Sequence, residues 1–290
     1  MTREQLIKEI FSKQTYLSVG LDTDINKIPK HLQSHPDAVY EFNKLIIDAT
    51  KDLCVSYKIN TAFYEAMGLK GWQAMEKTVN YIPSSHFKIA DAKRGDIGNT
   101  SSQYAKAFFD PQASGLNFDA ITVAPYMGED SVKPFLEYEN KWTILLGLTS
   151  NPGAADFELK QVLTQFDELE EGIHTRKHKI SFLYENVLET AASWGTPDNL
   201  MFVIGATKAD QLVNIRKIIP DNFLLVPGIG FQGGSLEEVS KYGMTKDCGL
   251  LVNVSRAIIY AGEKENFAEE ARAIAMQYQT EMKKYLKDYV

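Results

Sequence analysis

Cysteine is scarce in this 290-residue sequence, and its scarcity sets the first limit on the class of protein. The two cysteines, Cys54 and Cys248, lie far apart, and each stands beside an apolar run. A scaffold held together by disulfides needs more cysteines than this. We therefore expect two reduced thiols buried in the core and a reducing compartment.

Long apolar runs and an excess of basic residues are lacking as well. No apolar run approaches the roughly 20 residues that span a bilayer, and residues 1–10 have the pattern of a charged amphipathic helix, not of a signal peptide. The formal net charge of −7 argues against binding to a nucleic-acid backbone. We expect a cytoplasmic protein with no membrane and no nucleic-acid partner, in which one arginine could still hold a single phosphate.

Eight short apolar runs rich in Val, Ile and Leu alternate with helical patterns along the chain. Runs of this kind are typical of parallel strands that are buried on both faces. Eight strand–helix units predict an α/β fold, a (β/α)8 TIM barrel, and no linker or repeat divides residues 1–290 into more than a single domain. A last helical pattern at 267–287 would close the ring. The eight runs are 16–21, 53–57, 87–93, 120–124, 142–146, 201–205, 223–227 and 249–254.

The densest group of charges stands where the third run ends. Asp91 and Lys93 are two residues apart and so point to the same face of a strand, and Asp96 follows in the turn before a helical pattern at 103–109. A structural ion-pair network is the alternative explanation for such a group. Its place at the C-terminal end of a barrel strand, where these folds carry their chemistry, favours a catalytic site.

Neighbouring strand ends add polar groups to the same mouth. Asp22 follows the first run, and Lys58 and Asn60 follow the second. Lysines and carboxylates that alternate at close range keep one another charged and fix one another's geometry. We therefore expect an array of Lys58, Asp91, Lys93 and Asp96, with acid–base chemistry at Lys93.

The ends of the seventh and eighth runs predict a phosphate site. Residues 228–233 match the pattern G-x-G-x-x-G, but they follow the seventh strand, whereas a dinucleotide site needs this pattern after the first strand of a βαβ unit. Glycines let backbone N–H groups approach an anion, and Arg256 follows the eighth run. Together they favour a phosphate-monoester site, with a structural arginine over a helix end as the alternative.

A long insertion separates the fifth run from a helical pattern at 181–194. Residues 149–156, which include Ser150, are small and flexible and suggest a mobile lid, whereas 167–179 have the composition of a solvated excursion. Within the insertion, His174 and His178 are four residues apart but have no acidic partners placed by a strand, so we expect no metal site.

The segment 91–100, Asp-Ala-Lys-Arg-Gly-Asp-Ile-Gly-Asn-Thr, resembles the signature of the orotidine 5′-phosphate decarboxylase family. The segments 57–60, 227–230 and 254–256 also fall where that family needs them, and the length resembles its longer bacterial subfamily, type 2. The resemblance implies conversion of orotidine 5′-monophosphate to UMP and CO₂, the last step of de novo pyrimidine synthesis. It also implies a homodimer with shared active sites and no metal or organic cofactor.

The same resemblance implies a role for each matching residue. Lys93 would donate the proton to C6, Asp91 would lie beside the departing carboxylate, and Lys58 would contact the ribose and the charge array. Asp96 and Thr100 would reach into the partner's site. The remaining substrate-binding residues would be Asp22 for the ribose, Ser150 for the pyrimidine, Gln232 and Arg256 for the phosphate, and Asn60, Gly230 and Gly234.

Two other functions stay open at this point. A related Mg²⁺-dependent keto-sugar-phosphate decarboxylase or hexulose-phosphate synthase shares the pattern D-x-K-x-x-D, but its metal wants a carboxylate at the end of the second strand, where this sequence has Lys58. A non-catalytic nucleotide-binding barrel would keep Arg256 and the glycine loop and would have no need for Lys93.

Overall fold

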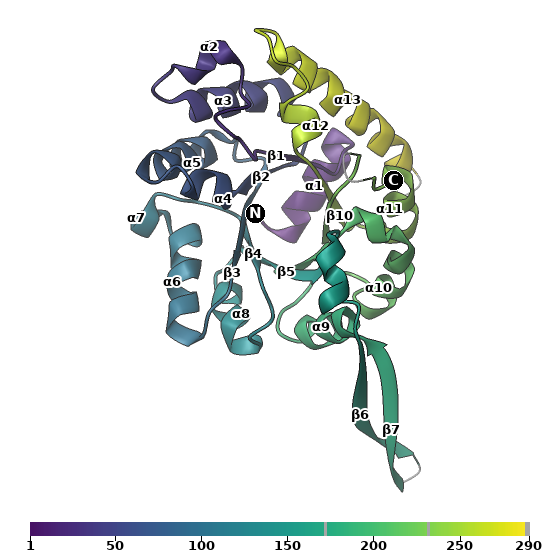
Figure 1. Ribbon diagram of the computed structural model, residues 1–290. Coiled ribbons are helices and arrows are strands. Elements are labelled where there is room, and N and C mark those ends of the chain that lie inside the picture. Colours follow the sequence, from purple (N-terminus) through teal and green to yellow (C-terminus); the bar gives the residue numbers. More distant parts are fainter. Residues whose placement is uncertain (171–172, 231–232, 288–290) are drawn as a thin grey trace.

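Eight parallel strands form a closed barrel, with helices around it (Figure 1). The computed structural model describes residues 1–170, 173–230 and 233–287. The predicted (β/α)8 barrel is confirmed. Around the ring the strands are β1 (Leu17–Gly20), β10 (Leu250–Val254), β9 (Leu224–Pro227), β8 (Leu200–Ile204), β5 (Trp142–Leu148), β4 (Ala120–Val123), β3 (Phe87–Arg94) and β2 (Ser56–Asn60).

The helices cover the barrel with amphipathic faces. In α3 (Ala38–Thr50), for example, Val39, Phe42 and Ile46 recur at a spacing of three to four residues and are buried. The 20-residue α13 (Phe267–Leu286) contacts α3 and α12, and so joins the two ends of the ring as predicted. The other helices are α1 (Arg3–Lys13), α2 (Lys30–Gln33), α4 (Thr61–Glu65), α5 (Leu69–Tyr81), α6 (Gly98–Phe109), α7 (Pro111–Ser114), α8 (Glu129–Leu136), α9 (Leu183–Ala192), α10 (Leu212–Ile218), α11 (Leu236–Gly243) and α12 (Arg256–Ile259), with 3₁₀ turns η1 (Pro152–Asp156) and η2 (Ala206–Gln211).

Helix α1 closes the end of the barrel from which the strands start. Its first residue, Arg3, lies over the ring of Phe223 at 5.1 Å and pairs with Asp247 at 3.2 Å. The indole of Trp142 packs edge-on against Phe87 and Phe223. These aromatic contacts fill the end of the barrel at which the strands begin.

Two predicted boundaries were wrong. The second strand was expected at 53–57, but β2 begins at Ser56 and includes Lys58, both of them buried. The apolar pattern failed there because the barrel interior is partly polar: Ser18 Oγ donates to Ser56 Oγ at 3.1 Å. The helix expected at 103–109 begins already at Gly98, so Thr100 lies in its first turn.

The insertion after β5 contains a β-hairpin that the sequence analysis did not anticipate. Strands β6 (Gln161–Glu170) and β7 (Ile173–Phe182) pair antiparallel over ten residues each and project away from the barrel (Figure 1). Leu183 N donates to Lys160 O at 2.8 Å, so the hairpin leaves and rejoins the barrel at one point. Most of the stretch expected as a solvated excursion, 167–179, therefore lies in regular strands.

Both cysteines are buried and free, as expected. In the part of the chain that the structure describes, no helix combines the length and the apolar character that a membrane crossing requires.

His86 is buried where β3 begins. Its Nε2 lies 2.7 Å from Lys51 O and 2.9 Å from Lys13 Nζ. Burial, helped by the Lys13 ammonium, lowers the pKa of His86 to about 4. The imidazole is therefore neutral in the folded protein at neutral pH.

We expect the free energy of unfolding to fall as the pH is lowered from about 6.5 to about 4. In this window His86 is protonated only in the unfolded chain, which therefore binds more protons, and the full loss is about 3 kcal/mol. Urea titrations at several pH values would measure it. In His86→Gln the slope of the unfolding free energy against pH should be shallower by the equivalent of about one proton in this window. Parallel plots of the unfolding free energy against pH for the two proteins would contradict this assignment.

Candidate active site

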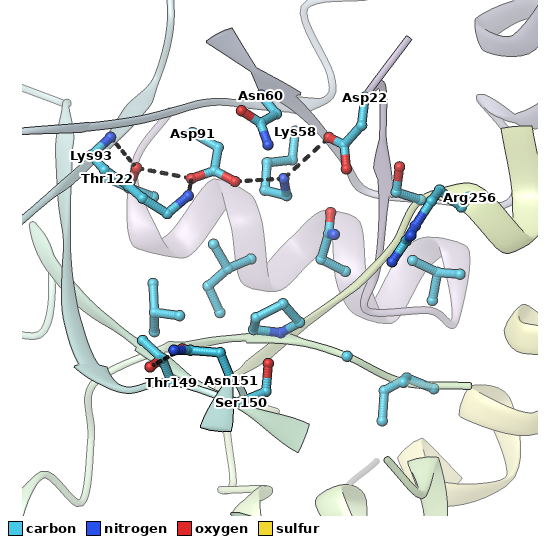
Figure 2. Close-up of a pocket in the computed structure, with 18 of the residues that line it drawn as sticks. Asp22, Lys58, Asn60, Asp91, Lys93, Thr122, Thr149, Ser150, Asn151 and Arg256 are labelled. Carbon is cyan, nitrogen blue, oxygen red and sulfur yellow. Dashed lines mark hydrogen bonds and ion pairs between the residues drawn. The ribbon is translucent and has the colours of Figure 1, made fainter. Parts of the chain in front are cut away.

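The carboxylate of Asp91 lies between two lysine ammonium groups at the mouth of the barrel. Lys58 Nζ is 2.8 Å from Asp91 Oδ2, and Lys93 Nζ is 2.6 Å from Asp91 Oδ1. Asp22 extends the row, since its Oδ1 lies 3.5 Å from Lys58 Nζ (Figure 2). Four charges of alternating sign, from β3, β2 and the end of β1, thus form one continuous cluster.

Burial and charge act against each other on these groups. Burial alone would neutralise Lys58, but the Asp22 and Asp91 carboxylates outweigh it and raise the pKa of Lys58. For Asp91 burial again favours the neutral form, and Lys58 and Lys93 outweigh it, which holds the pKa of that carboxyl well below its usual range. Asp91 is therefore an anion and Lys58 a cation at neutral pH.

The Lys93 backbone is unusual for a strand. Its φ is +47°, in the left-handed region, and the pairing of β3 with β4 shifts register between Ala90 and Arg94. A non-glycine residue in this conformation costs about 1–2 kcal/mol and persists only where its surroundings hold it. The Lys93 side chain is about half exposed, so its ammonium faces the open part of the cavity.

Arg94 points away from the cluster. Its guanidinium pairs with Glu65, donates to Ala92 O at 2.9 Å and lies over the rings of Tyr104 and Phe108. These contacts tie the end of β3 to α4 and α6. The two adjacent side chains therefore have different roles: that of Lys93 lines the site, and that of Arg94 anchors the end of the strand.

The cluster forms one wall of a cavity of about 320 Å³, a volume within the range of small-molecule sites. Arg256 lies at the opposite end of the cavity from Lys93 (Figure 2). Beside it the Ser255 Oγ is buried and has no hydrogen-bond partner among the described residues. Gly20 makes room for this segment, because a Cβ there would lie 2.6 Å from Ser255 Cβ.

The loop after β5 faces the cluster across the cavity and carries Thr149, Ser150 and Asn151 (Figure 2). Glu158 anchors this loop: Thr149 N and Thr149 Oγ1 both donate to its carboxylate, at 2.6 and 2.8 Å. Gly205 at the end of β8 packs so closely that a Cβ there would lie 2.7 Å from Ser150 N. The loop therefore sits against the barrel wall. The lid expected at 149–156 stays a prediction.

Seven of the predicted site residues line this cavity. They are Asp22, Lys58, Asn60, Asp91, Lys93, Ser150 and Arg256. Asp96 and Thr100 do not line it in this chain: Asp96 Oδ1 accepts from Ile97 N at 2.7 Å, and Thr100 is exposed. The four-charge array of this chain thus contains Asp22 in the place expected for Asp96.

The predicted glycines lie just outside the described lining. Gly230 N donates to Gly234 O at 3.2 Å and Gly234 N to Gly228 O at 3.1 Å, so both N–H groups bind within the loop. Gly228, with φ of +98°, does line the cavity. Gln232 lies outside the described residues.

Sequence reasoning left two lining residues without a role. Thr122 on β4 contacts both Asp91 and Lys93, and Asn253 on β10 is buried with its Oδ1 unpartnered within the described ranges. A polar residue inside an otherwise apolar strand was the available signal for both. Across those same ranges, no group of three or more His, Cys, Asp or Glu is placed to hold a metal ion.

Comparison with known proteins agrees with this geometry. Residues 15–271 match the profile of the orotidine 5′-phosphate decarboxylase / HUMPS family. The chain belongs to this family. The orotidine 5′-phosphate decarboxylase of Flavobacterium johnsoniae is 56% identical over 97% of both chains, and that of Bacteroides fragilis is 53% identical over 99% of both.

Solved structures of the decarboxylase family have the same fold. The OMP decarboxylase of Leishmania donovani superposes with a TM-score of 0.76 at 32% identity, covering 97% of this chain and 100% of that one. The UMP synthase of the same organism gives a TM-score of 0.76 at 34% identity. The match covers 94% of this chain and 56% of that protein, so this chain spans about half the length of the synthase.

The two lysines of the cluster should contribute differently to stability. Lys58→Met leaves the partly buried carboxylates of Asp22 and Asp91 without their shared cation and should lower the free energy of unfolding by about 3 kcal/mol. Lys93→Met removes a half-exposed ammonium, with a loss of about 1 kcal/mol or less. Urea unfolding at pH 7 would measure both, and equal losses would contradict the difference in burial.

Proposed function

We propose that this protein converts orotidine 5′-monophosphate to UMP and CO₂. One observation carries the proposal: Lys93, the predicted proton donor, pairs with Asp91 at 2.6 Å in a cavity that has Arg256 at its other end. The relatives named orotidine 5′-phosphate decarboxylase, at 53–56% identity over nearly the whole chain, support the same reaction.

In this proposal Lys93 supplies the proton that replaces CO₂. Loss of CO₂ breaks the bond between C6 and the carboxyl carbon and leaves the electron pair on C6, where the pyrimidine ring delocalises it poorly. A fixed ammonium stabilises this developing charge and then donates its proton to C6. Asp91 holds the Lys93 ammonium in place and lies beside the departing carboxylate.

Lys58 keeps this arrangement charged. Its ammonium contacts both Asp22 and Asp91, and together with Lys93 it compensates the Asp91 carboxylate, which burial would otherwise tend to protonate. In the proposed complex Asp22, Lys58 and Asn60 face the ribose, and Ser150 on the opposite loop faces the pyrimidine. The substrate would thus lie between the charged wall and the β5 loop.

The phosphate would bind at Arg256 and beside the backbone N–H of Gly228, since Pro227 has no N–H group. A guanidinium and backbone N–H groups are standard phosphate ligands in barrels of this type. Gln232, Gly230 and Gly234 belong to the same loop in the proposal, with the two glycines shaping its path. Binding energy from this remote group orients the reacting carbon beside Lys93.

Asp96 and Thr100 would complete the site of a second subunit in a homodimer. They lie at the surface where α6 begins, and the side chain between them, Ile97, is 62% exposed. The neighbouring loop before α8 carries Tyr126, which is 91% exposed, and Met127. An exposed apolar group next to two polar site residues suits a subunit interface.

The two rival functions are less well supported. Lys58 places a cation between Asp22 and Asp91, where the Mg²⁺-dependent relatives need an open carboxylate, and it would repel the metal. A binding module would need Arg256 but not the Lys93–Asp91 pair.

The deciding assay is the loss of orotidine 5′-monophosphate absorbance, with CO₂ release, in the presence of EDTA. Abolition by EDTA would favour the metal enzyme, and UMP binding without CO₂ release the binding module. We expect the enzyme to work in the cytoplasm without a cofactor.

Replacing Lys93 should separate chemistry from binding. Lys93→Ala should lower kcat by about 10³-fold or more, because it removes both the proton donor and the electrostatic stabilisation, while UMP still binds at Arg256. Steady-state kinetics and calorimetry with UMP would measure the two effects. Lys241→Ala, at an exposed position on α11, is the control, and a fully active Lys93→Ala protein would refute the proposed donor.

Mixed variants test the shared site. If Asp96 acts in the partner's site, inactive Lys93→Ala and Asp96→Ala proteins should regain roughly one quarter of wild-type activity after subunit exchange, because half of the dimers carry one intact site of two. Mixing Lys93→Ala with Asp91→Ala should restore no activity. Both residues act in the site of their own subunit, so each site of the mixed dimer still lacks one of them. No recovery in the first mixture would rule out sharing through Asp96.

Removing Arg256 should weaken only ligands that carry a phosphate. We expect Arg256→Ala to raise KM for orotidine 5′-monophosphate by about 10- to 100-fold, because charge-assisted hydrogen bonds are lost. Affinities for UMP and uridine, measured by calorimetry, should become similar. Equal losses for ligands with and without phosphate would contradict this role.

A further inference from the structure

Thr122 occupies a position in the site to which nothing above gives a role. It lies on β4 and is 1% exposed, and its hydroxyl joins Lys93 and Asp91, the pair at one end of the cluster. Lys93 N lies 2.9 Å from Thr122 Oγ1, and Thr122 Oγ1 lies 3.1 Å from Asp91 Oδ1 (Figure 2). One hydroxyl therefore contacts the backbone of the lysine and the carboxylate that the lysine binds.

The direction of both hydrogen bonds follows from the groups involved. A backbone N–H can only donate, so Thr122 Oγ1 accepts from Lys93 N. An ionised carboxylate can only accept, so the single hydroxyl proton points to Asp91 Oδ1. No other arrangement satisfies both partners. A side chain of the same shape without the hydroxyl would satisfy neither.

The backbone explains why a side chain is needed at this point. Regular pairing of β3 with β4 ends at Ala90 and resumes at Arg94, so the Lys93 N–H bonds to the Thr122 side chain instead of to a carbonyl of β4. The same residue has φ of +47°. The hydroxyl thus spans the gap in the ladder and holds a strained backbone conformation.

We propose that Thr122 is a positioning residue for Lys93. Its hydroxyl fixes the Lys93 backbone on one side and the Asp91 carboxylate on the other, so that the ammonium meets the reacting carbon in one orientation. This inference rests on the proposed function. Because a small misplacement of a catalytic group reduces the rate more than it reduces binding, the effect should appear in kcat.

The test compares Thr122→Val with Thr122→Ser. Thr122→Val keeps the shape and removes the hydroxyl, and should lower kcat by about 10- to 100-fold with KM within about threefold of wild type. Thr122→Ser keeps the hydroxyl and should stay within about fivefold of wild-type kcat. Thr143→Val on β5 is the matched control: Thr143 is buried, its Oγ1 has no partner within the described ranges, and it lies outside the cavity lining.

A second readout does not depend on activity. Exchange of the Lys93 amide hydrogen, followed by NMR, should accelerate at least about tenfold in Thr122→Val, because its acceptor is gone, and should not change in Thr143→Val. If Thr122→Val does not fold, Thr122→Cys against Thr122→Ser makes the same comparison, since a thiol is a much weaker hydrogen-bonding group.

The possible outcomes separate the two proposals. Thr122→Val with the kcat of Thr143→Val, or Thr122→Ser as impaired as Thr122→Val, overturns the positioning role and leaves the decarboxylase intact. If the wild-type protein releases no CO₂, the proposed function fails, and the exchange of the Lys93 amide then decides alone. If the exchange rate is unchanged in Thr122→Val, the proposed role of the Thr122 hydroxyl in fixing the Lys93 backbone is overturned. Faster exchange supports that role.

Discussion

A buried carboxylate that must stay ionised is the constraint on which this site depends. Asp91 lies inside the barrel mouth, where an isolated anion would take up a proton, and the ammonium groups of Lys58 and Lys93 prevent this. Each partner comes from a fixed position at a strand end. The closed barrel is therefore what makes the charge arrangement possible, because only a rigid ring holds these strand ends in register.

The part of the site that could be predicted is the part that strand geometry determines. Parallel strands in a barrel end at one mouth, so residues that follow apolar runs in the sequence must meet in space. This rule brought Lys58, Asp91 and Lys93 together even though the boundary of β2 was misplaced by three residues. The boundary error did no harm, because Lys58 lies directly after the predicted strand and inside the observed one, so both assignments bring it towards the same mouth.

The rest depends on features that leave little trace in a single sequence. Thr122 looks like one β-branched residue among others in its strand. Its hydroxyl accepts a hydrogen bond from Lys93 N because the β3–β4 ladder is interrupted at that point. The loop glycines were expected to offer N–H groups, but Gly230 and Gly234 use theirs within the loop. The hairpin was missed because its strands are polar and alternate weakly, so composition alone indicated a solvated excursion.

The joining point of that hairpin bears on how such a chain can vary in length. Because Lys160 and Leu183 are hydrogen-bonded neighbours, the intervening segment forms a closed excursion whose removal or extension leaves the path from β5 to α9 unchanged. Insertions whose ends meet place no strain on the parent fold. This position should therefore tolerate insertions of additional sequence without any change in the arrangement of the charges at the barrel mouth.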